Sequence, residues 1–188
     1  QYIEYDGETL KYHSLKGDVP LDTSLHSEFS ITHVLHDGSV LVQRYNHDLM
    51  RYDPVAHTSE LIMTFDHSIN AMDGNSDSTK VAMIVENKIM ELDLLKRSLK
   101  TLKEYHPINI PFIFGNDDIL GYCVKWAPDE RGVLFTSYSL FQNIWLSQLI
   151  TGFYQTRDVY YYDIAEKREY FVHGFIDNFE VIDNLNFN

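Results

Sequence analysis

The feature that most constrains the fold is a short segment that recurs along the chain. Each copy alternates apolar and polar residues and ends in an aromatic residue or leucine followed by aspartate, at Tyr52-Asp53, Leu92-Asp93 and Tyr162-Asp163. Alternation with a period of two is what a half-buried β-strand requires. The first two copies lie 40 residues apart, and Tyr12-His13 occupies the same place 40 residues earlier. The third copy follows the second by 70 residues, which is one period plus 30 inserted residues. A period of this length indicates a repeat architecture.

Three further strand patterns surround each of these anchor strands. Short turns such as Asp37-Gly38 and Asn46-His47 separate them, so the sequence predicts consecutive hairpins. The predicted strands are 31–35, 40–44, 48–53 and 60–65 in the first full copy, 69–72, 81–85, 88–93 and 99–104 in the second, and 122–126, 133–137, 158–163 and 167–172 in the third.

We therefore expect an all-β fold, a β-propeller made of four-stranded antiparallel blades, with about half a ring present in the chain. Residues 1–188 are expected to form a single partial propeller. Its predicted parts are the end of a blade (1–25), a blade (26–66), a second blade (67–105), a third blade (106–178) with a long insertion (139–157), and the start of a further blade (179–188).

The anchor aspartates and the rhythm of strands and turns resemble those of WD-repeat and related propellers over almost the whole chain. The third copy also resembles the propellers of TolB-type proteins and prolyl peptidases, whose blades carry a Trp-Ser-Pro-Asp-Gly turn. Trp126-Ala127-Pro128-Asp129 stands in that place here. This resemblance implies a propeller architecture.

Charge limits the classes of partner. The net charge is -13 and the pI is near 4.9, with Lys and Arg scattered along the chain. Such a protein repels phosphate backbones, so nucleic acid and anionic membranes are not expected as partners. The longest uncharged run, 132–156, contains several amide and hydroxyl side chains, which argues against a membrane span.

Cysteine usage bears on the compartment. Cys123 is the single cysteine and the sequence has no Asn-x-Ser/Thr acceptor, so no feature marks a disulfide-stapled or glycosylated domain. We expect a cytoplasmic or nuclear location, with periplasmic and extracellular locations left open.

Candidate chemical groups favour structural interpretations. His33, His36 and Asp37 suggest a metal cluster, but alternate positions on a strand point to opposite sides and do not converge. The segment 73–77 begins like a calcium loop, yet its twelfth position is Ile84 rather than glutamate, which favours a turn. Asp117-Asp118 is expected on a solvated loop, without a partner base. The anchor aspartates are expected to hold turns by accepting hydrogen bonds.

No nucleophile elbow, phosphate loop or paired Cys and His occurs in the sequence. We therefore expect no catalytic residues, no metal and no cofactor within this chain, and hence no enzyme activity of its own.

The insertion at 139–157 is the main departure from the repeat. It carries apolar side chains with helical spacing, namely Leu140, Phe141, Ile144, Trp145 and Leu149. These are the predicted partner-binding residues, because insertions in repeat proteins map to loops on one face. The alternative is that the segment packs on its own blade.

The sequence thus predicts a non-catalytic β-propeller scaffold that mediates protein–protein interaction in a multi-subunit complex. Two alternatives are a propeller that controls substrate access in a prolyl-peptidase-like serine hydrolase, and a periplasmic ligand-binding propeller. A catalytic domain in the first alternative would lie outside these residues.

Overall fold

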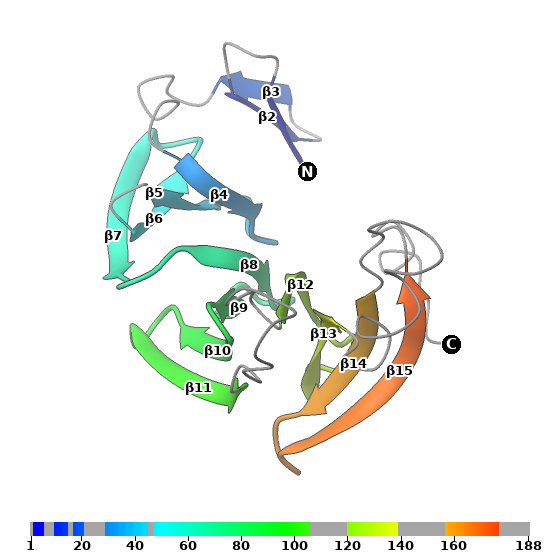
Figure 1. The fold of residues 1–188 in the computed structure, drawn as a ribbon. Coiled ribbons are helices and arrows are strands. Elements are labelled where there is room, and N and C mark those ends of the chain that lie inside the picture. The colour runs from blue at the N-terminus through cyan, green and yellow to red at the C-terminus, as the bar shows by residue number, and fades with distance from the viewer. Residues whose placement is uncertain are drawn as a thin grey trace, which may run out of the picture.

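The computed structural model describes residues 2–5, 10–14, 17–20, 29–44, 47–105, 120–138 and 157–176. All regular secondary structure in these residues is β-strand (Figure 1). A short three-stranded sheet contains β1 (Tyr2–Tyr5), β2 (Leu10–Ser14) and β3 (Gly17–Pro20), in that order. The predicted anchor-like segment at Tyr12-His13 lies in its central strand.

Three four-stranded antiparallel sheets follow. Sheet I contains β4 (Phe29–Val34), β5 (Val40–Arg44), β6 (Asp48–Asp53) and β7 (Thr58–Thr64). Sheet II contains β8 (Ile69–Gly74), β9 (Lys80–Val85), β10 (Lys88–Asp93) and β11 (Ser98–Glu104). Sheet III contains β12 (Leu120–Trp126), β13 (Gly132–Tyr138), β14 (Arg157–Asp163) and β15 (Arg168–Ile176).

Each sheet is a simple meander in which consecutive strands pair. The sheets stand along an arc, with β4, β8 and β12 on its inner side and β7, β11 and β15 on its outer side (Figure 1). All twelve strands predicted in the three full copies are present. Several bounds differ from the prediction by one or two residues, and the last strand ends at Ile176 rather than at residue 172. In addition, the turn expected from Asp73 begins only after Gly74, which still pairs with Val81 in the β8–β9 ladder.

Backbone irregularities recur at equivalent positions and so support the repeat. In the pairing of the third and fourth strands, the register shifts between Leu49 and Met50, between Ile89 and Met90, and between Val159 and Tyr160. Such bulges increase the local twist of a sheet. The positive φ angles of His57, Arg97 and Lys167 recur in the same way, four residues after each anchor aspartate.

The hydrophobic core lies between sheets and not on one side of them. In β9, Val81, Met83 and Val85 belong to a cluster shared with sheet I, whereas Ala82 and Ile84 belong to a cluster shared with sheet III. Both faces of sheet II are therefore buried, which explains why β9 is a continuous apolar run and not an alternating one.

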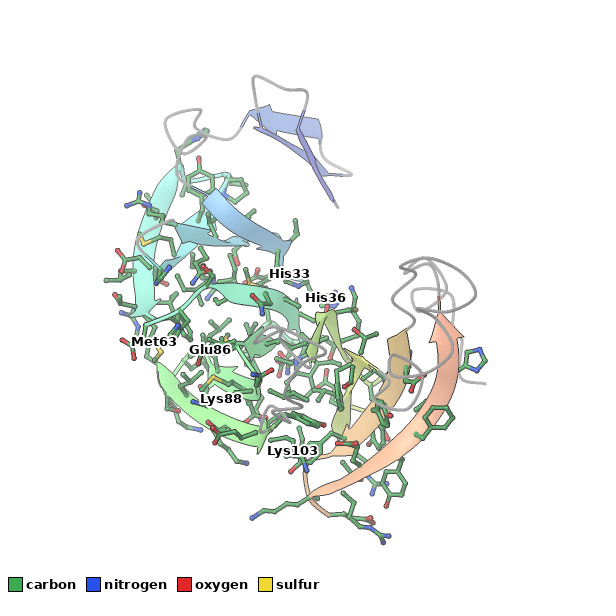
Figure 2. All side chains as sticks on the ribbon, in the orientation of Figure 1. His33, His36, Met63, Glu86, Lys88 and Lys103 are labelled. Carbon is green, nitrogen blue, oxygen red and sulfur yellow. The ribbon has the colours of Figure 1, made fainter. Side chains whose placement is uncertain are left out.

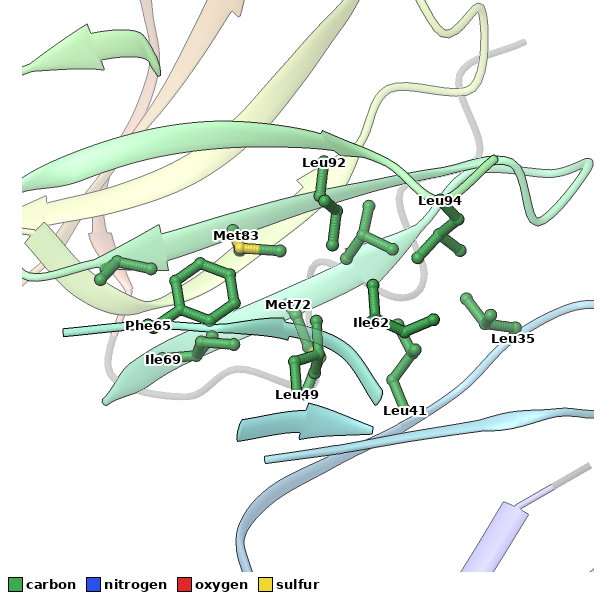
Figure 3. Packing of buried hydrophobic residues seen from close by; sticks show 12 residues of the cluster. Leu35, Leu41, Leu49, Ile62, Phe65, Ile69, Met72, Met83, Leu92 and Leu94 are labelled. Carbon is green, nitrogen blue, oxygen red and sulfur yellow. The ribbon is translucent and has the colours of Figure 1, made fainter. Parts of the chain in front are cut away.

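The cluster between sheets I and II brings together side chains from strands β5 to β10 and from the segments that connect them (Figure 3). Leu41 and Leu49 of sheet I face Met83 and Leu92 of sheet II, and all four are fully buried. Burying a side chain of this size stabilises the fold by roughly 1.5–3 kcal/mol before chain entropy is counted. This packing holds the neighbouring sheets together.

Several predicted features lie outside the described residues. They are the loop with Asp117-Asp118, the final segment 179–188, and the candidate partner-binding residues Leu140, Phe141, Ile144, Trp145 and Leu149 of the insertion. The blade boundaries given above remain predictions. In the part of the chain that the structure describes, no helix has the length and apolar character to cross a membrane.

Candidate functional site

The three anchor aspartates hold equivalent turns. The Oδ1 atom of Asp53 accepts hydrogen bonds from the backbone N–H groups of Val55 and Ala56, at 2.8 and 3.0 Å. Asp93 and Asp163 do the same for the second and third residues after them. The prediction that these carboxylates are structural is confirmed.

A second set of aspartates holds the turns between the first and second strands. Asp37 Oδ1 accepts from the N–H of Ser39 at 2.9 Å, Asp77 Oδ1 from the N–H of Thr79 at 3.0 Å, and Asp129 Oδ1 from the N–H of Arg131 at 3.1 Å. Acceptance of such bonds favours the ionised carboxylates of Asp37 and Asp77. Although partial burial opposes it, these contacts and the adjacent Arg51 guanidinium lower the pKa of Asp37.

The histidines do not form the metal cluster that their spacing suggests. His33 lies on the inner strand β4 with Nε2 toward sheet II, whereas Asp37 is engaged by Ser39 and Arg51 (Figure 2). Among the described residues, no group of three His, Cys, Asp or Glu side chains is placed to hold a metal ion.

The calcium-like segment is also a structural turn. Asp73 is on strand β8 and faces sheet III, and Asn75 Oδ1 accepts hydrogen bonds from the N–H groups of Thr79 and Lys80, at 3.0 and 2.8 Å. Asp77 binds Thr79. The two aspartates thus serve different contacts. The interpretation as a turn is confirmed for residues 75–77, whereas Asp73 and Gly74 belong to strand β8.

Side chains on the inner strands connect one sheet to the next. The backbone N–H of Gly74 donates to His33 Nε2 at 2.9 Å, and the backbone N–H of Trp126 donates to Asp73 Oδ2 at 2.8 Å. Lys125 Nζ lies 3.5 Å from Asp73 Oδ1. Residues 33, 73 and 125 occupy equivalent positions, so the inner strands carry a repeated link between sheets.

The turns at one end of the sheets are linked as well. The backbone N–H of Asp37 donates to Ser78 Oγ at 3.0 Å. Glu130 accepts from the backbone N–H of Ser76 at 2.8 Å and from Asn75 Nδ2 at 3.3 Å. Hydrogen bonds from Ser76 outweigh a small desolvation effect and lower the pKa of Glu130.

Two polar side chains between sheets, one buried and one half-buried, were not anticipated from the sequence. Gln43 is fully buried, accepts from the N–H of Ile69 at 2.7 Å and donates to the carbonyl of His67 at 3.3 Å. The Tyr105 hydroxyl donates a hydrogen bond to Glu169. Partial burial, and to a smaller extent this hydrogen bond, raises the pKa of Tyr105. The available signal for Gln43 was its amide directly after the apolar run 40–42, since a buried polar group needs hydrogen-bond partners.

Exposed apolar side chains form the remaining candidate surface. Val55 and Leu95 are 80% and 77% exposed, and they occupy the same position in the last turn of sheets I and II. Residues Tyr170, Phe171 and Val172 on the outer strand β15 are also exposed. Exposed apolar groups of this kind are candidates for partner contacts.

The sequence matches no protein-family model. No curated protein matches it either. Solved structures do resemble the fold. TolB from Acinetobacter baumannii shares 17% identity with a TM-score of 0.57, over 86% of this chain and 36% of that one. A chain of the nidogen/laminin complex shares 7% identity with a TM-score of 0.56, over 92% of this chain and 57% of that one.

The β-propeller domain of Cps50 (Swd1) from Myceliophteria thermophila is a third match, with 11% identity and a TM-score of 0.47, over 78% of this chain and 38% of that one. The chain spans between about a third and somewhat more than half of these structures. Sheets I, II and III are blades of a β-propeller. The chain has the fold of a partial propeller, as the repeat predicts.

Proposed function

We propose that the chain is part of a non-catalytic β-propeller scaffold that binds a protein partner within a multi-subunit complex. The observation that carries this proposal is the pair of exposed apolar side chains, Val55 and Leu95, at equivalent places on adjacent blades. The residues before them, Pro54 and Leu94, are buried, so the turn separates a packing position from an exposed one.

The use of the polar side chains supports a scaffold. Asp53, Asp93 and Asp163 are occupied with turn amides, and His33 and Asp73 with amides of the next blade. Histidine and aspartate are the side chains that most often serve as general acids and bases in catalysis. Their hydrogen bonds give each of them a structural role.

The proposed binding surface is the end of the blades that carries the last turn of each sheet. Val55 and Leu95 each follow an anchor aspartate by two residues, and the third blade has Ala165 in that place. A partner that covers this end of the blades would bury two large apolar groups one blade apart. Burial of each would favour binding by roughly 1–2 kcal/mol.

The insertion gives a second candidate contact. Leu140, Phe141, Ile144, Trp145 and Leu149 keep their predicted role as partner anchors within this proposal. The low number of cysteines and the missing glycosylation acceptors support a cytoplasmic or nuclear location for the complex.

Affinity purification of the intact parent protein, followed by mass spectrometry, tests the proposal. Three variants are compared with wild type: deletion of 139–156, the double variant Val55→Ser/Leu95→Ser, and the control Lys100→Ala on the exposed side of β11. The proposal expects stoichiometric partners with wild type and control, and loss of at least one partner with the deletion or the double variant.

A parent protein that purifies alone and cleaves peptides would contradict the scaffold and favour the prolyl-peptidase-like alternative. A parent protein that purifies alone with a bound small ligand would favour the ligand-binding propeller. Circular dichroism of each variant confirms that the blades remain folded, so that loss of binding reflects the altered surface.

A further inference from the structure

One histidine forms a hydrogen bond between the inner strands of sheets I and II. His33 Nε2 accepts a 2.9 Å hydrogen bond from the backbone N–H of Gly74 across the contact between the two sheets. The same nitrogen lies 3.9 Å from Asp73 Oδ1, and the His33 side chain is 20% exposed. A nitrogen that accepts a hydrogen bond carries no proton, so the neutral imidazole holds its proton on Nδ1.

The backbone around Gly74 is closely packed against sheet I. A Cβ atom placed on Gly74 would lie 2.5 Å from Leu35 Cδ2 and 3.5 Å from His33 Nε2. The backbone of β8 therefore approaches sheet I where His33 and Leu35 project from it, and Leu35 is 1% exposed. An amide that loses its acceptor at such a place leaves a part-buried donor unpaired.

The charges that face His33 come from three elements. Asp73 on β8 favours the imidazolium, whereas Lys125 on β12 and His36 in the following turn disfavour it. Burial is the largest influence, and the net effect lowers the pKa of His33. The structure therefore holds the neutral form, which agrees with the role of Nε2 as an acceptor.

We propose that His33 is a proton-sensitive link between sheets I and II, in which protonation at Nε2 releases the Gly74 amide and loosens β4 from β8. A proton on Nε2 would face the Gly74 N–H, so two donors would oppose each other. The imidazolium can satisfy its new proton by turning toward Asp73, and this rotation also abandons Gly74. Either response breaks the same hydrogen bond.

The next link along the inner strands provides an internal comparison. At the position of His33, sheet II has Asp73, whose Oδ2 accepts from the Trp126 N–H at 2.8 Å. A carboxyl group keeps an oxygen that accepts hydrogen bonds in either protonation state, so this link does not depend on the protonation of an imidazole. Mild acid should therefore loosen the contact between sheets I and II while the contact between sheets II and III persists.

The sign of the effect follows from linkage. Because the folded chain lowers the pKa of His33, the unfolded chain binds the proton more tightly between the folded value and about 6.5. The contribution of His33 to stability is complete above about pH 6.5 and is lost as the pH falls through the folded pKa.

Amide hydrogen exchange of the full 188-residue chain, measured by NMR from about pH 7.5 to about pH 4.5, tests the link. After correction for the intrinsic pH dependence of exchange, the protection factor of Gly74 should fall about tenfold through the His33 titration, while that of Trp126 stays unchanged. The ring ¹⁵N shifts of His33 should show an unprotonated Nε2 at pH 7.5.

Two variants separate a proton link from mere packing. His33→Gln offers a non-titrating acceptor and should keep Gly74 protected across the whole range. His36→Gln removes the neighbouring exposed imidazole, the smallest of the influences on His33, and should keep the fall in Gly74 protection with its midpoint moved only slightly upward. A protonated Nε2 at pH 7.5, or equal protection of Gly74 above and below the His33 titration, would overturn the proposal, as would an unchanged fall in His33→Gln.

Discussion

The Oδ2 atom of Asp73 accepts a 2.8 Å hydrogen bond from the backbone N–H of Trp126, across the contact between sheets II and III. Its other oxygen, Oδ1, lies 3.5 Å from Lys125 Nζ. A carboxylate on an inner strand thus binds both the backbone and a side chain of the following blade. This relationship makes Asp73 a link between blades and not part of a calcium loop.

Replacement of Asp73 by Ala should therefore destabilise the chain. The loss should be about 1.5–3 kcal/mol, since a hydrogen bond to a charged acceptor is removed and the Trp126 amide is left without it. Asp73→Asn keeps an oxygen acceptor and should lose clearly less. Urea unfolding followed by tryptophan fluorescence measures both changes. Equal stability of the Ala variant and wild type would show that the link contributes nothing.

Gly132 should tolerate a side chain less well than Gly74. A Cβ atom at Gly132 would overlap the backbone carbonyl oxygen of Tyr162 and lie 2.6 Å from the ring of Tyr161, whereas the nearest atom at Gly74 is the flexible end of Leu35. A backbone carbonyl cannot move without disturbing the β13–β14 ladder. Gly132→Ala should cost about 3 kcal/mol or more and Gly74→Ala about 1 kcal/mol. Thermal unfolding of the two variants measures this difference. Equal midpoints for Gly132→Ala and Gly74→Ala would contradict the expected order.

Phe135 should be a main support of the cluster between sheets II and III. It is 1% exposed, and its ring lies 5.9 Å from that of Tyr105 and 5.8 Å from that of Tyr160. Phe135→Ala should cost about 3–5 kcal/mol, because a cavity is added to the lost transfer energy. Phe135→Leu, which keeps most of the volume, serves as the control and should cost less than half as much in the same denaturant titration.

The sequence allows the strand pattern to be predicted because alternation and turn chemistry are local properties. Anchor strands ending at Asp53, Asp93 and Asp163 have the predicted bounds or differ by one residue. The carboxylate acceptors of the turns are equally local, since each bonds amides two and three residues ahead. Such contacts can be inferred from the anchor aspartate and the few turn residues that follow it.

Links between blades could not be predicted in the same way. His33 and Gly74 are 41 residues apart, and Asp73 and Trp126 are 53 apart. Their contact depends on how the sheets stack, which the period of the repeat does not specify. Even the boundary of β8 shows this, because Asp73 looks like a turn residue until its partner on β12 is known.

The turn held by Asp163 offers a test of the anchor role. Asp163 is 4% exposed, accepts from the N–H groups of Ala165 and Glu166 at 2.9 and 2.8 Å, and lies 3.5 Å from Arg131 Nη2. Asp163→Ala should lower stability by about 1–2 kcal/mol through the lost turn bonds. Asp163→Asn retains Oδ1 as an acceptor and should recover most of that loss. If the Asn variant were no more stable than the Ala variant, the loss of stability would come from the missing charge and not from the turn hydrogen bonds.

Sheets I, II and III are successive blades around one axis, and the proposed scaffold requires that their equivalent turns face one end. Distances between spin labels measure this most directly. The exposed equivalents Val55→Cys, Leu95→Cys and Ala165→Cys can be labelled in pairs, in a Cys123→Ala background that removes the one native thiol. Successive blades should give similar 55–95 and 95–165 distances, and the 55–165 distance should be clearly shorter than their sum because the array of blades curves. A 55–165 distance equal to that sum, or two unequal neighbouring distances, would contradict this arrangement of blades.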